Sequence, residues 1–290
     1  MTNKTIVYIP ISPEIEELAS EHHHDREAAL ELLKDIQTRH AGLSPATITD
    51  AARSLKLPPH HLYGLATFYS MLSLQERRKI LRVCDGPVCW LKRANETRQA
   101  IEKIASTDKN ITVERTSCLG LCDRAPAVLV EDEQAGPIDA NDALKLCEGW
   151  RGTPTDYSKE RKGELRVMTA LIGKINPDSI DDALEHSGYD GLKKAIQTKP
   201  TTVLDIVESS GLQGRGGAGF PVGRKWRFVA NEKRMPRYIV CNADESEPLI
   251  FKDRVLIDTN PHQLLEGMII SGFACGASEA WIYIRGEYEV

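Results

Sequence analysis

The sequence has no long apolar run. No segment approaches the about 18 consecutive apolar residues typical of a membrane-spanning helix, and the most apolar late segment, Met268–Cys275, is far shorter. The N-terminus also lacks the basic residues followed by an apolar core that mark a secretory signal. We therefore expect no membrane span and a location in the cytosol or on the cytosolic face of a membrane complex.

A strong charge of either sign is missing as well. The 37 Lys and Arg residues against 42 Asp and Glu residues give a net charge of −5 over 290 residues. Such a slightly acidic balance argues against a general nucleic-acid binder, because nucleic acid attracts basic surfaces. The length allows two domains with cores of their own.

What the sequence does have is seven cysteines, an odd number that disfavours a disulfide framework in a cytosolic chain. Four of them form two pairs, Cys84 with Cys89 and Cys118 with Cys122, in the spacing C-x4-C, 28 residues, C-x3-C. Each pair follows a run that predicts a β-strand. Two loops can therefore bring four thiolates together, which is typical of a metal site.

The spacing bears on which metal is bound. Iron and zinc both accept four thiolates, but structural zinc usually takes them from knuckles with two intervening residues. Wider spacings suit a two-iron cluster, in which each pair can hold its own iron. We predict a [2Fe–2S] cluster, with zinc and inert or disulfide-linked cysteines as alternatives. The remaining cysteines are interpreted as small buried hydrophobic residues.

The first half of the chain changes once from a helical sequence pattern to a mixed pattern of strands and helices. Residues from Asp25 to about Leu72 predict short helices, one of them beginning at an N-cap Ser44 followed by Pro45. A β-α-β-β-α order follows, which predicts a small thioredoxin-like α/β domain. Its elements are expected at residues 80–83, 95–105, 111–115, 127–130 and 139–150.

A polar stretch with Gly, Pro and a charge run, residues 151–165, predicts a linker. The fold class expected is α/β. Helical sequence follows from Ser179 to about Glu208, with an interruption near Pro200. The predicted domains are a helical N-terminal segment (1–75), the thioredoxin-like domain (76–150), the linker (151–165) and a second domain (166–290).

The second domain opens with a glycine-rich segment. Five glycines fall within the nine residues 211–219, and Lys225 follows closely. Such a loop lets backbone amides approach a phosphate or a flat ring without Cβ obstruction, and Arg215 and Lys225 can supply positive charge. A nucleotide site is one interpretation, and a flexible loop without a ligand is the other.

Polar residues follow a predicted strand at 237–241. The segment Asn242–Pro248 holds three acids and one amide within six residues. At the end of a buried strand these groups are costly unless they meet a ligand or a cation. Carboxylates there can accept hydrogen bonds from ribityl or ribose hydroxyls, whereas a solvated turn is the simpler alternative.

Taken together, the cysteine pairs, GRGGAGFP, Lys225-Trp226 and CNADESEP resemble the NADH-oxidising module of respiratory complex I and its relatives. These relatives include the diaphorase parts of NAD-reducing hydrogenases and the β-subunits of NAD-dependent formate dehydrogenases. Residues from about 15 to 150 are similar to the small [2Fe–2S] subunit, and residues from about 165 to 290 to the beginning of the flavoprotein subunit.

The resemblance implies cofactors and ligands. The cofactors would be one [2Fe–2S] cluster, FMN and NAD(H), with the cluster held by Cys84, Cys89, Cys118 and Cys122. FMN phosphate and backbone contacts would come from Gly214, Arg215 and Gly216, with Lys225 near flavin and nucleotide. The ribityl region would meet Asn242, Asp244 and Glu245. Facing NADH would be Gly217, Phe220, Phe228 and Glu247.

One departure and one absence accompany the resemblance. The family usually continues Glu-Pro-Gly-Thr, whereas this chain has Leu249 after Pro248, so the turn loses a glycine. The family's second flavin-binding segment, ubiquitin-like domain and C-terminal four-cysteine [4Fe–4S] motif have no counterpart. We therefore expect an incomplete FMN/NADH-binding domain that is weakly active or inactive alone.

The resemblance implies an NADH:acceptor oxidoreductase component that passes electrons between NAD(H), FMN and iron–sulfur clusters. No catalytic acid–base pair is expected. The partners would be NADH or NAD and other subunits of a redox complex, and the downstream acceptor is left open. The alternative is a non-catalytic [2Fe–2S] electron-transfer or assembly subunit without a functional nucleotide site.

Overall fold

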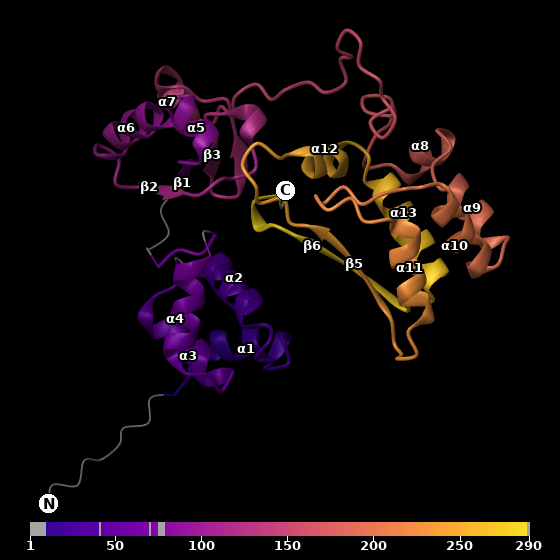
Figure 1. Ribbon diagram of the computed structural model, residues 1–290. Helices are drawn as coiled ribbons and strands as arrows, with labels where there is room; N and C mark the ends of the chain where they lie inside the picture. Colours follow the sequence, from indigo (N-terminus) through magenta and orange to yellow (C-terminus); the bar gives the residue numbers. More distant parts are fainter. Residues whose placement is uncertain (1–9, 41, 70, 75–78, 289–290) are drawn as a thin grey trace, which may run out of the picture. The chain divides into compact units, whose positions relative to one another are not determined.

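The computed structural model describes residues 10–40, 42–69, 71–74 and 79–288 (Figure 1). The chain divides into two compact units, the first ending at Thr153 and the second beginning at Pro154. This division falls inside the stretch 151–165, for which the sequence predicts a linker. The other domain bounds stay predictions.

Four amphipathic helices begin the first unit: α1 (Pro13–Glu21), α2 (Ala29–Arg39), α3 (Pro45–Ser54) and α4 (Pro59–Phe68). They enclose a core of their own, which includes Ile15, Leu18, Leu32, Leu33, Ile36, Ile48 and Leu62. The predicted start of α3 is confirmed, because Ser44 Oγ accepts the backbone N–H of Thr47 at 3.1 Å. Helix α1 lies within the predicted helical segment 1–75, but before residue 25, where the detailed prediction of individual helices begins.

A four-stranded sheet follows in the same unit, in the order β2-β1-β3-β4. Its strands are β1 (Lys79–Cys84), β2 (Ile111–Thr116), β3 (Val128–Val130) and β4 (Glu133–Ala135), and its helices are α5 (Pro87–Leu91), α6 (Ala94–Ala105) and α7 (Ala143–Cys147). Strands β1 and β2 are parallel, whereas β3 and β4 are antiparallel to their neighbours. The predicted strands and the helix at 95–105 are confirmed.

The predicted order omits helix α5, and two further expectations for this domain are wrong in detail. Strand β4 is absent from the predicted order because it has no apolar run of its own. It forms by pairing with β3 in a hairpin, through a two-residue turn at 131–132. The closing helix expected over 139–150 is shorter: a 3-10 turn at Ala140–Asp142 precedes α7, which ends at Cys147. Asp139 begins this region, since its carboxylate accepts the N–H groups of Asn141 and Asp142.

The second unit has helices on one face of a small parallel sheet. Its helices are α8 (Ile180–Glu185), α9 (Asp190–Ile196), α10 (Pro200–Ser209), α11 (Val222–Asn231), α12 (Lys252–Thr259) and α13 (Pro261–Cys275), and its strands are β5 (Tyr238–Ala243) and β6 (Glu279–Ile284). The helical stretch predicted over 179–208 has an additional break at 186–189, where Ser187 and Tyr189 adopt positive φ.

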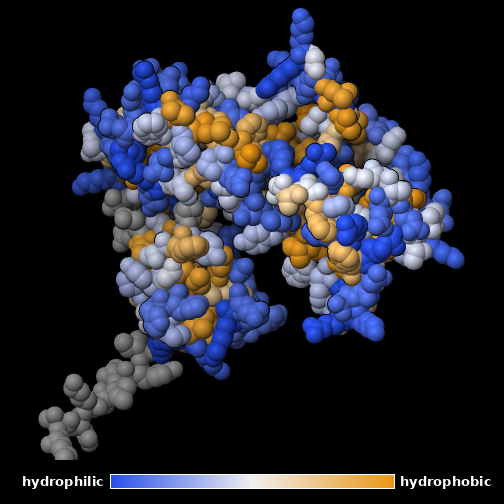
Figure 2. Space-filling view, viewed as in Figure 1, coloured by the Kyte–Doolittle hydropathy of each residue, from blue (hydrophilic) through white to orange (hydrophobic). Residues whose placement is uncertain are grey.

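Strands β5 and β6 pair in parallel from Tyr238↔Glu279 to Ala243↔Ile284. Helix α13 packs on the sheet, with Ile239 close to Gly272. All six residues of β6 are exposed, and Trp281 retains 61% of its accessible surface. Hydrophilic side chains cover much of the surface visible in Figure 2, interrupted by hydrophobic patches. No helix among the described residues is long and apolar enough to cross a membrane.

The cap of α3 can be tested against a matched position. Both Ser44 and Ser12 are N-cap residues followed by Pro, but the Ser12 side chain caps no amide. Replacing Ser44 by Ala should lower the free energy of unfolding of the helical region by about 1 kcal/mol, measured by urea denaturation and circular dichroism. Ser12→Ala should change it by less than about 0.5 kcal/mol. Equal effects would contradict the assigned cap.

Candidate functional site

The sheet of the first unit brings the two cysteine pairs together. Cys84 is the last residue of β1 and is paired in register with Thr116, the last residue of β2. Cys89 follows on α5, and Cys118 and Cys122 follow β2 on a loop that ends in a 3-10 turn. Because β1 and β2 are parallel, both loops leave the same edge of the sheet.

All four cysteines are free thiols in a mostly apolar setting. Cys84 and Cys89 keep 2% and 1% of their accessible surface. The Sγ atoms of Cys118 and Cys122 lie 3.5 Å apart, and the Cys84 thiol contacts those of Cys89 and Cys118. Buried Leu119, Leu121, Ala127 and Leu129 surround this group.

The sulfur atoms perturb one another. Hydrogen bonding from Cys118 lowers the pKa of Cys84, but the bond with Cys89, burial and the charge of Cys89 together raise this pKa to about 11. The bond with Cys84 and burial raise the pKa of Cys118, whereas the bond from Cys84 lowers the pKa of Cys89. Four adjacent thiolates therefore need a positively charged centre to be ionised together.

The donor set fits an iron–sulfur cluster. Two sulfurs bound tetrahedrally to one metal at about 2.3 Å lie about 3.8 Å apart, close to the 3.5 Å between Cys118 and Cys122. Over the described part of the chain, no three His, Cys, Asp or Glu side chains are already arranged around a single ion position. The sulfurs are in pairwise contact instead. A cavity of about 350 Å³ lies beside Cys84, lined in part by Trp90 and Arg115.

In the second unit the glycine-rich segment forms a hairpin between α10 and α11. Gly214 N–H donates to the carbonyl of Phe220 at 2.9 Å, and Val222 N–H donates to that of Leu212 at 2.9 Å. The exposed tip between them contains the predicted residues Arg215, Gly216 and Gly217. Gly217 has a φ of 118°, a value that disfavours other residues.

Aromatic and basic side chains gather where this hairpin enters α11. The exposed rings of Phe220 and Phe228 lie 6.4 Å apart at an angle of 47°. The guanidinium of Arg224 lies 6.0 Å from the Phe220 ring centre, and exposed Lys225 is the next residue. These groups offer flat apolar surface and positive charge, which suit a ring and a phosphate.

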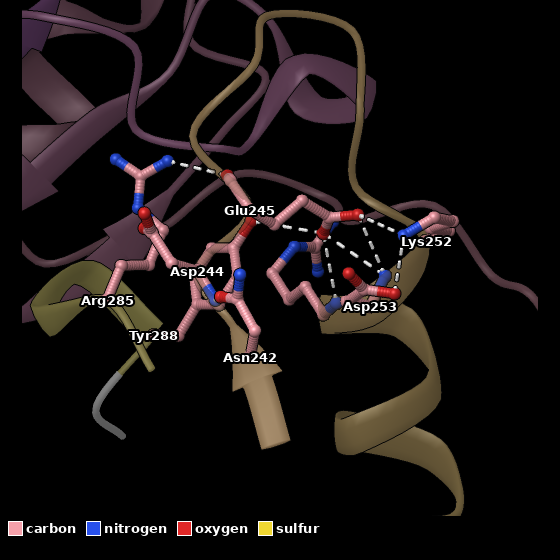
Figure 3. Close-up of polar contacts among 8 residues, drawn as sticks. Asn242, Asp244, Glu245, Lys252, Asp253, Arg285 and Tyr288 are labelled. Carbon is pink, nitrogen blue, oxygen red and sulfur yellow. Dashed lines mark hydrogen bonds and ion pairs between the residues drawn. The ribbon is translucent and has the colours of Figure 1, made fainter. Parts of the chain in front are cut away.

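The polar side chains at the end of β5 and in the acidic loop after it alternate between exposed and buried positions. Asn242, Asp244 and Glu247 are exposed, whereas Glu245 is buried. Asp244 N–H donates to Asn242 Oδ1 at 3.1 Å, so these two residues are held together on the exposed side. In Figure 3 the Glu245 side chain instead extends toward Lys252 and Asp253. The sequence-based expectation groups it with Asn242 and Asp244 at the ribityl region.

Leu249 occupies the turn in which the sequence lacks the expected glycine. Its φ is 72°, in the left-handed region that costs about 1–2 kcal/mol for residues with a Cβ. The turn thus keeps the conformation that a glycine would adopt. Its strain lies two residues after Glu247, beside the exposed polar loop.

Three residues of this region are missing from the sequence-based set. Arg224 lies over Phe220, and Arg285 and Tyr288 contact Glu245. Residue type gives no signal for Arg224, because Arg227 on the same helix is equally basic and forms ion pairs with α10 instead. Arg285 and Tyr288 reach Glu245 only because β5 and β6 pair in parallel.

Two family models match separate parts of the chain. Residues 15–151 match the family model of the thioredoxin-like [2Fe-2S] ferredoxin, and residues 207–290 match that of the Nuo51 FMN-binding domain. The chain therefore combines a thioredoxin-like [2Fe–2S] domain with sequence of a Nuo51-type FMN-binding domain. The expected resemblance, the mixed α/β fold class and the cluster and FMN cofactors are confirmed.

Two relatives align with different portions of this chain. The F subunit of NADH-quinone oxidoreductase in Aquifex aeolicus is 57% identical over 124 residues, 43% of this chain and 29% of that protein. The NAD-reducing hydrogenase HoxS subunit alpha of Cupriavidus necator is 28% identical over 281 residues, 91% of this chain and 46% of that protein. The chain thus spans less than half the length of either relative.

A solved structure agrees over both units. The crystal structure of an NAD+-reducing [NiFe]-hydrogenase in the air-oxidized state matches with a TM-score of 0.71 and 26% sequence identity. The match covers 93% of this chain and 48% of the hydrogenase chain. The order of the cysteine-bearing domain and the glycine-loop domain is therefore shared with a known redox protein.

Relieving the strain at Leu249 should stabilise the second unit. Leu249→Gly should raise its free energy of unfolding by about 0.5–1 kcal/mol, because glycine adopts positive φ without a Cβ clash but loses more chain entropy on folding. Thermal unfolding measures the change. Ile250→Gly is the control and should destabilise, since Ile250 is not at positive φ. A destabilising Leu249→Gly would contradict the strain.

Proposed function

We propose that this chain is the NAD(H)-oxidising component of a multi-subunit redox complex, passing electrons between NAD(H), FMN and iron–sulfur clusters. The observation that carries the proposal is the presence, in one chain, of four converging thiols, a glycine hairpin and an acidic loop at the end of a strand. The functions for which the relatives are named, NADH-quinone oxidoreductase and NAD-reducing hydrogenase, support the same assignment.

In this proposal Cys84, Cys89, Cys118 and Cys122 hold the [2Fe–2S] cluster. Three of the four are buried, which limits the access of water to the sulfur atoms, and the apolar residues around them keep the local dielectric low. Trp90, which is 67% exposed, follows Cys89 directly. The cluster ligands therefore lie close to a surface through which single electrons can leave.

The flavin and dinucleotide would lie against the second unit. Gly214, Arg215 and Gly216 would hold FMN through backbone contacts and positive charge, with Lys225 near the phosphates. Asn242 and Asp244 would accept hydrogen bonds from the ribityl chain. The residues proposed to face NADH are Gly217, Phe220, Phe228 and Glu247.

FMN bound there would supply the conversion between two-electron hydride chemistry and one-electron transfer, and a [2Fe–2S] cluster held by the four cysteines would supply one-electron transfer. The side chains of this unit therefore need only position and polarise the flavin and the dinucleotide. Phe220 and Phe228 provide apolar ring surface, and the side chains of the exposed residues Asn242 and Asp244 would fix the orientation of the flavin. A proton-transferring acid–base pair is not part of the proposal.

Anaerobic purification and spectroscopy of the 1–290 chain test the function. We expect a [2Fe–2S] signal in electron paramagnetic resonance, FMN binding, and slow NADH-dependent bleaching of the flavin absorption, in line with the weak activity expected of this chain alone. Reduction of ferricyanide by NADH then measures turnover. A cluster signal without flavin binding would favour the non-catalytic electron-transfer subunit, and a protein that contains only zinc would overturn both assignments.

The cluster ligands can be tested within the first unit. Cys118→Ser should lower iron content and the visible absorption several-fold, because a serine hydroxyl is a poor replacement for a thiolate at iron. Cys147→Ser is the matched control, since Cys147 belongs to the same unit but ends α7 away from the sulfur group. Equal loss in both variants would show that folding, and not ligation, was affected.

A further inference from the structure

Glu245 is a buried carboxylate with only internal contacts in the described structure. Its side chain is 2% exposed. Oε1 accepts the N–H of Asp253 at 2.9 Å and lies 3.6 Å from Lys252 Nζ. Oε2 accepts the N–H of Arg254 at 3.2 Å and the hydroxyl of Tyr288 at 3.4 Å. A carboxylate has about four lone-pair sites, so these contacts use its capacity.

The contacts with Asp253 and Arg254 place the carboxylate at the N-terminus of α12. The first amides of a helix have no partner within the helix, and a negative charge there also complements the helix dipole. Phe251, the N-cap residue, provides no side-chain cap. Glu245 therefore caps α12 from a neighbouring loop.

The backbone of the same residue is anchored on another segment. Arg285 Nη1 donates to the Glu245 carbonyl at 3.0 Å. Arg285 is itself held by Glu287 through two contacts of 3.0 Å, Nε to Oε2 and Nη2 to Oε1. Arg285 and Glu287 are only 8% and 11% exposed at their side chains. Residue 245 thus joins the acidic loop to both α12 and the segment after β6 (Figure 3).

We propose that Glu245 is a positioning residue for the flavin site and not one of its ligands. By fixing the loop from the buried side, it keeps Asn242, Asp244 and Glu247 directed outward. The identity of the ligand rests on the proposed function, but the anchoring of the loop is a property of the protein alone. An experiment can therefore disprove FMN as the ligand without disproving the anchoring of the loop, and the reverse.

Substitutions in the 1–290 chain test the role. Glu245→Ala should weaken FMN binding about 10–100-fold, the usual effect of losing a residue that orients ligands. Glu245→Gln should weaken it less, because the amide oxygen still accepts an N–H. Glu266→Ala is the matched control: Glu266 Oε1 accepts the N–H of Leu192 at 2.9 Å in the same unit, at α9.

FMN affinity is measured by quenching of flavin fluorescence, at a temperature where circular dichroism shows every variant folded. Glu266→Ala should lower thermal stability while leaving the FMN dissociation constant unchanged. Unchanged FMN affinity in Glu245→Ala would overturn the proposal. So would equal weakening in Glu245→Ala and Glu266→Ala, since that result indicates general destabilisation.

Hydrogen exchange supplies the readout that does not need flavin. In Glu245→Ala, amide exchange should accelerate at 242–248 and at 253–254, with the rest of the unit unchanged. If the unmodified chain binds no FMN, the proposed function fails. Hydrogen exchange alone then decides whether Glu245 anchors the loop. Exchange that stays slow at those amides, or accelerates across the whole unit, would overturn the anchoring.

Discussion

Parallel pairing of two strands is the constraint on which both sites depend. In the first unit the pairing of β1 with β2 ends at Cys84↔Thr116, so the loops that carry the cysteine pairs begin side by side. In the second unit the pairing of β5 with β6 ends at Ala243↔Ile284, and the acidic loop and the Arg285 segment begin side by side in the same way. Residues far apart in sequence meet at the carboxyl ends of the strands.

Much of this arrangement could be predicted from local patterns. The cysteine spacing and the short apolar runs before each pair indicate strands that end at ligands, and the structure has β1 and β2 there. Ser44 followed by Pro45 predicts a helix start because both residues favour that position for chemical reasons of their own. Such signals depend on a few adjacent residues.

The rest of the fold and of the candidate site depends on contacts between distant residues, which no local sequence pattern indicates. Strand β4 consists of Glu133, Gln134 and Ala135, and only its pairing with β3 makes it a strand. Similarly, three acids in sequence predict a polar loop, but which of them turns inward follows from the pleat of β5 and from the position of α12. Glu245 could therefore be assigned a polar role from the sequence, but its direction could not be predicted.

The exposure of β6 affects how this protein must be handled. Its sequence, EAWIYI, has one charged residue and is otherwise rich in aromatic and β-branched side chains, all of them exposed. Proteins usually protect such strands with lysine, proline or a covering segment, because they favour strand-to-strand association between copies. Self-association at high concentration would compete with ligand measurements, so titrations belong in dilute solution, with light scattering recorded alongside.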